Sequence, residues 1–404
     1  MVVPACGRLG RVATGVRART ATHRWRWPVL ASMVALGGVV LAAALVSGGR
    51  PLDLAVYLAG GDAVMHGRPL YDAAGPHGLL FTYPPFAALL VTPLALVPAP
   101  LAAAAVTAGS LALLARLVAV GLPDRAVRAR WLLPLTVAAL ALEPVRLTLQ
   151  LGQVNLLVVG AVVLDATSDR IPRRARGVLT GLAAGVKLTP LVLLPYLVLT
   201  GRRRAAATAG AAALGATLLA TVALPHDTAR YWLHVVSDPH RIGSAAYAGN
   251  SAYSGLVARV EHRPQPAGLA WVVGELLLIG VGLAVAVLAH RRDARLGLCL
   301  AGLTGLLVSP ISWTHHWVWL VPLAVVVADL GRRGLAALVV AVAVVSPQQL
   351  LPRGGDVEYA FGAGRLAADS AYLLLGVLLL LVLAREDGRH GAAAHAGGPL
   401  RRPA

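Results

Sequence analysis

The sequence feature that most constrains the fold is a succession of apolar runs, many about as long as a helix that spans a bilayer. Short clusters of arginine separate several of these runs. A soluble globular chain carries about 25% charged residues, whereas this chain of 404 residues carries 13%. The pattern predicts an all-α polytopic membrane protein. It argues against a soluble enzyme, a disordered chain and a disulfide-stapled secreted module.

The charge balance agrees with a membrane protein. The chain has 36 Lys and Arg against 18 Asp and Glu, a formal net charge of +18. Such an excess can indicate nucleic-acid binding, but here the arginines lie between apolar runs, as in cytoplasmic loops. We therefore expect the lipid bilayer as a partner and no nucleic acid. Cys6 and Cys299 are far apart in the sequence, so no disulfide framework or cysteine metal site is expected.

The arginine clusters also predict the topology. Residues 1–27 are basic and are expected to form a cytoplasmic tail, followed by an uncleaved first helix at 28–47. The membrane domain is predicted to span 28–384 with about 10 to 13 crossings. A Gly-, Ala- and Arg-rich tail at 385–404 is expected to be disordered and cytoplasmic. Both termini then lie in the cytoplasm of a multi-pass plasma-membrane protein.

Polar segments between the apolar runs are expected on the external side. The first external loop is predicted at 48–80 and a longer one, which also reads as a partly ordered lid, at 225–268. Two apolar segments are harder to count. Residues 81–122 read as two helices, and residues 177–200 read as two short half-helices broken by proline.

A carboxylate directly follows the first predicted helix. Asp53 would lie at a membrane–water boundary, where burial raises the pKa of a carboxyl group and suits it to act as a base. Tyr57 follows four residues later and shares a helical face with Asp53 if this stretch is helical. The plainer interpretation is that Asp53 only N-caps an interfacial helix.

Two more clusters carry tyrosine and amide side chains. FTYPP, 81–85, places Tyr83 at the headgroup level before a helix, as an aromatic belt residue or a substrate contact. QLGQVN, 150–155, carries Gln153 and Asn155 between two apolar runs. Amides both donate and accept hydrogen bonds, which suits sugar hydroxyls. They also cap tight turns between helices, so both interpretations stay open.

The fourth cluster is SPISWTHHWVW, 309–319, at a predicted external helix start. It contains His315 and His316, and imidazole can bind a phosphate oxygen, move a proton or ligate a metal. Adjacent histidines rarely ligate one ion and no carboxylate lies at ligand spacing, so no metal is expected. Trp313 has a face that stacks on a sugar ring or on lipid.

Two further candidates stand apart from these clusters. Lys187 is the only lysine and lies in an apolar segment, where it either snorkels to the interface or meets a phosphate. Asn250, in GNSAYSG, is a candidate partner for a hydroxyl. The sequence has no phosphate-binding Walker loop and no HExxH or CxxC motif. We therefore expect no cofactor, and any sugar donor must be met at the membrane.

In their order along the chain, several of these segments resemble glycosyltransferase family 87, integral membrane enzymes of the GT-C superfamily. The resemblance covers residues from about 48 to 322 and rests on DLAVYLAGGDAVMHGRPLYD, FTYPPFAALL, LGQVNLL, GLAAGVKLTPLVLLPYL, GNSAYSG and SPISWTHHWVWLVP. The best-known members are α-(1→2)-mannosyltransferases that use polyprenyl-phosphate mannose. The resemblance implies a GT-C helix bundle with its active site in external loops and a lipid-linked or glycan acceptor.

The resemblance also implies roles for the residues. Asp53 matches the position of the catalytic base, which deprotonates the acceptor for an inverting displacement. His315 or His316, with Lys187, would hold the donor phosphate. The substrate-binding candidates are Tyr57, Tyr83, Gln153, Asn155, Asn250 and Trp313. One departure is GNSA, where a glutamine is expected beside the asparagine.

Three alternatives remain open from the sequence. A pentosyl (arabinosyl) transferase of the same superfamily would share most of these features. A lipid-linked-sugar transporter or flippase would need a polar path across the membrane midplane, where Glu275 is the clearest ionisable residue. A non-catalytic scaffold would tolerate the loss of Asp53.

Overall fold

The structure is a computed structural model that describes residues 51–72, 75, 78–238 and 241–396, with the side chains of 386–396 excepted. The predicted first helix at 28–47 and the basic tail at 1–27 lie outside the described residues. The described part folds as an assembly of helices, which confirms the all-α class. Helices satisfy their backbone hydrogen bonds internally, as an apolar environment requires.

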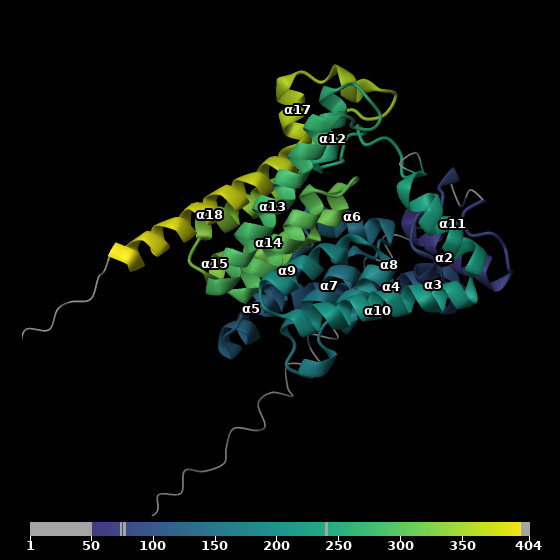
Figure 1. The fold of residues 1–404 in the computed structure, drawn as a ribbon, viewed down its shortest axis with the longest axis horizontal. Helices are drawn as coiled ribbons and strands as arrows, with labels where there is room; N and C mark the ends of the chain where they lie inside the picture. The colour runs from purple at the N-terminus through teal and green to yellow at the C-terminus, as the bar shows by residue number, and fades with distance from the viewer. Residues whose placement is uncertain (1–50, 73–74, 76–77, 239–240, 397–404) are drawn as a thin grey trace, which may run out of the picture.

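The helices differ widely in length (Figure 1). In chain order the α-helices are α2 (Leu52–Met65), α3 (Pro85–Ala95), α4 (Ala99–Val120), α5 (Arg125–Ala139), α6 (Glu143–Leu151), α7 (Asn155–Thr167), α8 (Val178–Val186), α9 (Leu193–Leu199), α10 (Arg203–Ala223), α11 (Pro225–Leu233), α12 (Tyr253–Val260), α13 (Leu269–Arg292), α14 (Ala294–Leu307), α15 (Leu320–Asp329), α16 (Arg333–Val345), α17 (Ala363–Asp369) and α18 (Ala371–Ala396). The short 3-10 helices are η2 (Arg173–Ala175), η3 (Thr189–Val192), η4 (Val235–Ser237), η6 (Thr314–Trp319), η7 (Pro347–Leu350) and η8 (Val357–Ala360).

The predicted 10 to 13 crossings are not confirmed. By length and composition, four helical segments of the described chain can cross a membrane, or up to six if the bent pairs α5–α6 and α17–α18 each form one span. The four are α4, α10, α13 and the segment Arg333–Leu350. Other apolar runs form helices of 10–17 residues, such as α7 and α14. Such helices are shorter than the roughly 20 residues that a full span needs.

Both ambiguous apolar segments divide as predicted. Residues 81–122 form α3 and α4, and the proline pair sets the start of α3, with Pro84 as its N-cap and Pro85 as its first residue. Residues 177–200 form α8 and then η3 with α9, separated by an extended Lys187. Proline at 190 cannot continue α8 because it lacks a backbone donor. The break places the only lysine outside regular helix.

The C-terminal tail differs from its prediction. Residues 385–396, which we expected to be disordered, continue α18. Alanine and arginine have high helix propensity, and adding residues to an existing helix is easier than starting one. Residues 397–404 lie outside the described part of the chain.

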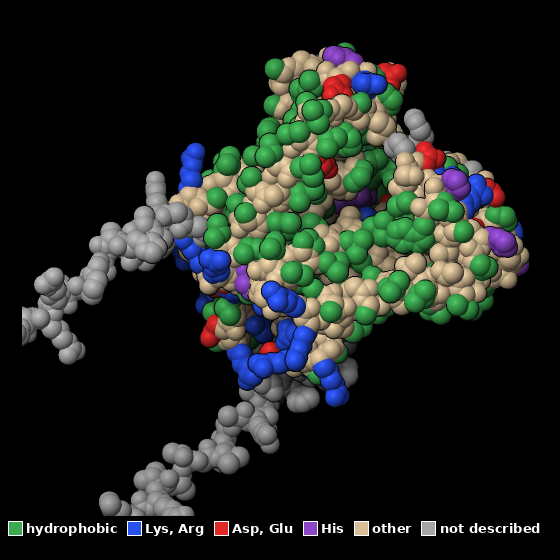
Figure 2. Space-filling model, in the orientation of Figure 1, with side chains coloured by type: hydrophobic (Ala, Val, Ile, Leu, Met, Phe, Trp, Pro, Cys, Tyr) green, Lys and Arg blue, Asp and Glu red, His purple; other side chains and the backbone are tan. Residues whose placement is uncertain are grey.

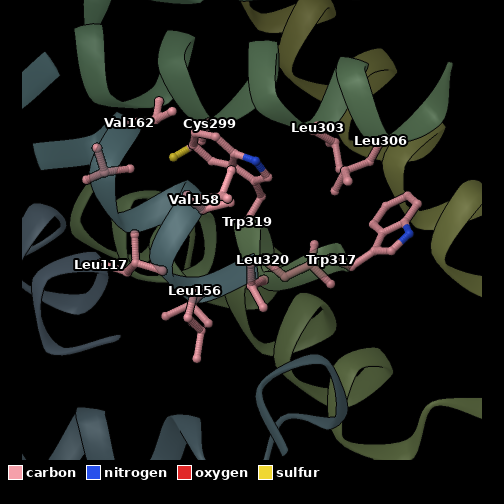
Figure 3. Close-up of a cluster of buried hydrophobic side chains, with 14 of the residues drawn as sticks. Leu117, Leu156, Val158, Val162, Cys299, Leu303, Leu306, Trp317, Trp319 and Leu320 are labelled. Atoms are coloured by element: carbon pink, nitrogen blue, oxygen red, sulfur yellow. The ribbon is translucent and has the colours of Figure 1, made fainter. Parts of the chain in front are cut away.

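The core lies where α4, α7, α14, α15 and η6 meet, and Figure 3 shows its buried side chains. Trp317 is fully buried and Trp319 is 6% exposed. The Trp319 ring packs against α14 at Gly302, where a Cβ atom would come within 2.3 Å of it. Glycine is therefore required at this contact. The core fixes η6, which carries the two histidines, against α7 and α14.

Two groups of short helices lie around this core. In Figure 1, α2, α3 and α11 lie at one end, and α12 with α17 projects above the long helices. Figure 2 shows a hollow between these two groups, with histidine and basic side chains visible in its floor. The predicted site residues come from the elements around this region.

Candidate active site

Asp53 lies in the first turn of α2, part-buried, with Pro51 as the N-cap residue. No side chain caps this helix end, so the interpretation that Asp53 merely N-caps α2 is wrong. Burial raises the pKa of the Asp53 carboxyl, while a hydrogen bond from Gln153 and the charge of Lys187 lower it, and the net shift is upward. A carboxyl with a raised pKa suits a general base.

Gln153 holds Asp53 in place. Its Nε2 donates to Asp53 Oδ2 at 3.1 Å and to the Tyr83 hydroxyl at 3.1 Å. Its Oε1 accepts from the Tyr57 hydroxyl and from the backbone N–H of Val154. The amide has no hydrogen-bonding capacity left. Gln153 therefore positions Asp53, and within the described residues no side chain donates to the other carboxylate oxygen, Oδ1.

The backbone before Gln153 explains this contact. Gly152 ends α6 in the left-handed region at φ 65°, which glycine adopts without strain. A Cβ atom at this position would lie 2.7 Å from Leu54 Cβ, so the turn packs directly on α2. Tyr57, predicted to share a face with Asp53, is 2% exposed and reaches the same amide. The Tyr57 and Tyr83 rings lie 4.9 Å apart between centroids.

A second polar group surrounds Lys187. The ammonium Nζ donates to Asn155 Oδ1 at 2.8 Å and lies 3.0 Å from His316 Nε2. Because an ammonium only donates, Nε2 of His316 accepts and its ring hydrogen is on Nδ1. Nζ also lies 6.0 Å from the centroid of the Tyr83 ring. Tyr83 thus connects the Asp53 group with the Lys187 group.

His315 has a different environment from His316. Its carbonyl accepts from Asn155 Nδ2 and from Thr148 Oγ1, both at 2.9 Å. Burial and the nearby charge of Lys187 lower the pKa of the His315 ring to about 3. The same causes, with His315 itself, hold the pKa of His316 well below its usual value. Both rings are therefore neutral at pH 7. Burial lowers the pKa of Lys187 to about 7 while the charge of Asp53 raises it, so the positive charge of this group comes from Lys187 in its protonated form.

An apolar pocket continues inward from this second group. Asn155, Lys187 and His316 line its polar end, and mainly aliphatic residues of α7, η3, α9 and α14 line the rest together with Trp319. Its cavity volume is about 30 Å³, room for one or two water molecules. The part-buried Lys187 therefore lies at the polar end of a narrow, mainly aliphatic slot.

Sequence analysis missed the carboxylate behind the histidine segment. Glu143 is 2% exposed and accepts from Thr314 Oγ1 at 2.6 Å and from Gln349 Nε2 at 2.9 Å. Its second oxygen accepts from the Tyr372 hydroxyl at 2.9 Å. Glu143 therefore anchors the start of η6. Its position next to QLGQVN was visible in the sequence, but partners more than 170 residues away were not.

Asn250 and Trp313 lie outside the contacts that join Asp53 to Lys187. Asn250 is 0% exposed, its Oδ1 accepts from the backbone N–H of Ser312 at 2.9 Å and its Nδ2 donates to Ala245 O at 2.9 Å. Its amide therefore supports the loop that leads to the histidines. Trp313 pairs with Asn250 in an antiparallel bridge, and its ring lies 5.8 Å from that of Tyr247.

A buried ion pair secures the same region and was also missed. Arg259 Nε lies 2.9 Å from Asp369 Oδ2, with side chains 1% and 0% exposed. Asp369 Oδ1 accepts from Gly249 N at 3.1 Å, and Arg259 Nη2 donates to Asn250 O at 3.2 Å. The pair joins α12 to α17 across the segment at 249–250. Within the described ranges, no group of three His, Cys, Asp or Glu side chains is placed to hold a metal ion.

Comparisons with known proteins find relatives that cover most of this chain. The family model for glycosyltransferase family 87 matches residues 81–310 of this chain. The chain is 33% identical, over 93% of both chains, to the polyprenol-phosphate-mannose-dependent α-(1-2)-phosphatidylinositol mannoside mannosyltransferase of Mycolicibacterium smegmatis.

Two other relatives carry related names. The chain is 37% identical to the protein of the same name from Mycobacterium tuberculosis, over 75% of this chain and 77% of the relative. It is 35% identical to a Mycolicibacterium smegmatis α-(1-2)-phosphatidylinositol pentamannoside mannosyltransferase, over 80% of this chain and 76% of the relative. No solved structure matches the chain significantly.

Proposed function

This chain belongs to glycosyltransferase family 87 and is a membrane glycosyltransferase, and from that premise we propose that it moves mannose from polyprenyl-phosphate mannose to a lipid-linked acceptor. The bond formed is an α-(1→2) mannoside. The relatives' names support the donor and support a phosphatidylinositol mannoside as the acceptor. The structural observation that carries the proposal is the line of contacts from Asp53 through Gln153 and Tyr83 to Lys187.

The proposed reaction is one inverting displacement. Oδ1 of Asp53 takes the proton of the acceptor hydroxyl, whose oxygen forms a bond to the anomeric carbon. The bond from that carbon to the phosphate oxygen breaks, and polyprenyl phosphate leaves with the electron pair. Gln153 keeps Oδ2 engaged, which leaves Oδ1 for the acceptor. Positioning of base, hydroxyl and anomeric carbon accounts for much of such a rate enhancement.

The leaving phosphate requires positive charge and hydrogen-bond donors. Lys187 provides the charge, and Nδ1 of His316 is a buried donor with no partner among the described residues. A neutral donor and a buried ammonium stabilise the charge that develops on the phosphate oxygen. Asn155 orients Lys187, and the carbonyl of His315 orients Asn155.

The other candidate residues divide into two groups in this proposal. The supporting residues are Tyr57, Gln153, Asn155 and Asn250. The candidates for direct sugar contact are Tyr83 and Trp313.

The aliphatic slot beyond Lys187 supports a lipid-linked donor. Its polar end would face the phosphate and its aliphatic walls would face the first isoprenoid units. A volume of about 30 Å³ is too small for an isoprenoid, so donor binding must move the lining side chains apart.

The proposed setting is a GT-C-type bundle that crosses the plasma membrane several times, with Asp53 and the histidines on the external face and both termini in the cytoplasm. The arginine clusters of the sequence support this orientation. The pentosyl transferase and the transporter or flippase are not favoured, because the relatives are named mannosyltransferases.

The direct test is a transfer assay with purified protein in detergent, where transport has no meaning. Radiolabelled polyprenyl-phosphate mannose is supplied with phosphatidylinositol mannosides, and polyprenyl-phosphate arabinose is supplied in parallel. We expect labelled mannoside as the only product, cleaved by an α-(1→2)-mannosidase. Transfer of arabinose alone, or of neither sugar by folded protein, would contradict the proposal.

A histidine substitution tests the phosphate contact. We expect His316→Ala to lower kcat/KM about 10- to 100-fold, because the transition state loses a positioned donor and Lys187 loses a partner. The matched control is His234→Ala, at an exposed histidine outside these contacts, which should retain wild-type kinetics. The measurement is the initial rate of transfer at varied donor concentration. Equal kinetics for both variants would remove His316 from the proposed site.

The pH dependence follows from the base. Below the pKa of Asp53 the carboxyl is protonated and cannot accept a proton, so log kcat/KM should rise with unit slope as the pH increases through that pKa. Burial raises that pKa, so this inflection should lie above the ordinary value of about 3.9 for aspartate. The value of log kcat/KM should fall again above about pH 7, where Lys187 loses its proton, because burial lowers the pKa of Lys187 to about 7. Transfer rates from pH 4 to 8 check this. A flat profile over the whole range would contradict the assignment of Asp53 as the titrating base.

A further inference from the structure

A second cavity lies at the other end of α7 from Asn155. Its cavity volume is about 540 Å³, much larger than the slot beside Lys187. Asp165, ten residues beyond Asn155 on α7 and hence about 15 Å along its axis, lies in its wall. Five arginines line the cavity: Arg173, Arg176, Arg202, Arg203 and Arg204. Lys and Arg side chains gather along the lower edge of the molecule in Figure 2.

Within the described residues, the protein compensates the positive charge of this cavity only in part. Asp165 is the one carboxylate in the lining, and its Oδ2 accepts from Gly177 N at 2.8 Å and from Thr180 Oγ1 at 2.7 Å. Arg176 is engaged with two backbone carbonyls. Within the described part of the chain, the other four arginines form no ion pair. Like charges that line one cavity repel one another. An anion bound in the cavity would offset this repulsion.

Close packing of α8 against α10 builds the cavity. A Cβ atom at Gly177 would lie 2.1 Å from Ala205 O, and one at Gly181 would lie 2.2 Å from Ala209 O. These glycines let the two helix backbones approach, which brings the segment with Arg173 next to the first turn of α10. The backbone arrangement that brings the two arginine segments together is therefore part of the fold.

Part of the cavity lining is apolar. Val162, Leu193 and Leu298 contribute to it, and all three are buried. A free anion needs only the arginines, whereas a phospholipid also has glycerol and acyl groups that favour an apolar surface. Basic pockets between helices of membrane proteins have the features that anionic headgroups require. We propose that this cavity binds the phosphate of an anionic phospholipid headgroup, at a site separate from Asp53 and Lys187.

The experiment measures lipid binding to the full chain in detergent by native mass spectrometry. The probes are dioleoyl phosphatidylglycerol, dioleoyl phosphatidylcholine as the zwitterionic control, and inorganic phosphate as a competitor. The test variant is R173Q/R203Q, which neutralises one exposed arginine from each of the two segments that line the cavity, η2 and the start of α10. The matched control is R125Q/R333Q, which removes two exposed arginines that do not line it.

We expect phosphatidylglycerol to bind more tightly than phosphatidylcholine, and R173Q/R203Q to weaken that binding about 10- to 30-fold. The control variant should bind as the wild type does. Competition by millimolar phosphate without any lipid preference would assign the same arginines to a soluble phosphate. Equal binding by wild type and R173Q/R203Q, or an equal loss in R125Q/R333Q, would overturn the proposal. Val162 and Leu193 line both this cavity and the slot beside Lys187, but the substituted arginines take no part in the proposed reaction, so these outcomes do not depend on sugar transfer.

Discussion

Asp53→Asn is expected to lower kcat for mannosyl transfer about 1,000-fold while the protein stays folded. The substitution keeps the shape of the side chain, and Gln153 Nε2 still has an oxygen to which it can donate. What is lost is the ability to take a proton from the acceptor, and a positioned general base contributes about 10²- to 10⁴-fold. The measurement is the initial rate of radiolabel transfer at saturating donor and acceptor.

Asp62→Asn is the matched control for this substitution. Asp62 lies on the same helix, α2, and its exposed carboxylate pairs with Arg68 and contacts His66. Exposed ion pairs contribute about 0–1 kcal/mol, so this variant should keep both its activity and its thermal unfolding midpoint. If Asp53→Asn retained more than about a tenth of the wild-type kcat, with a wild-type unfolding midpoint, Asp53 would not be the base.

The second large effect concerns stability. Asp369→Asn should lower the free energy of unfolding by about 3–5 kcal/mol, because it leaves the charge of Arg259 buried without its ion-pair partner. The hydrogen bond from Gly249 N can persist, since asparagine keeps an acceptor oxygen. The measurement is reversible unfolding in mixed micelles of mild and denaturing detergent. The control is Asp72→Asn, which removes the exposed pair with Arg230 and should cost less than about 1 kcal/mol.

A double variant separates the pair from its site. Replacing both partners, as in Arg259→Met with Asp369→Leu, removes the buried charge and should recover much of the stability that Asp369→Asn loses. The loop at 249–250 would still lose its polar contacts, so transfer activity should recover less than stability does. Equal stability of wild type and Asp369→Asn would show that the pair contributes little.

Much of the site geometry was predictable because its residues are unusual where they occur. Asp53, Gln153, Lys187 and His316 are polar residues beside apolar runs, and in a membrane protein such residues require a reason. The structure joins these four residues through hydrogen bonds, the Tyr83 ring and the Lys187–His316 contact. Asn250 was equally visible, but its full burial and backbone partners assign it to loop support.

Contacts between distant segments were not predictable. Glu143 and Tyr372 are 229 residues apart, and neither residue's neighbours indicate the other. The same holds for Arg259 and Asp369, which form a buried pair only because α12 and α17 meet. The arginine cavity also needed the fold, since its arginines come from two segments that Gly177 and Gly181 bring together.

The sequence by itself determined the helical class, the membrane character and the family of this protein. Residue type and local spacing carry that information, because burial of apolar helices and placement of charge act on each segment separately. Only the tertiary structure decided how many helices are long enough to span, which histidine contacts Lys187, and which amides are already occupied. The physical reason is that these properties depend on packing between segments far apart in the chain. Such packing selects one set of hydrogen bonds among many that the same side chains allow.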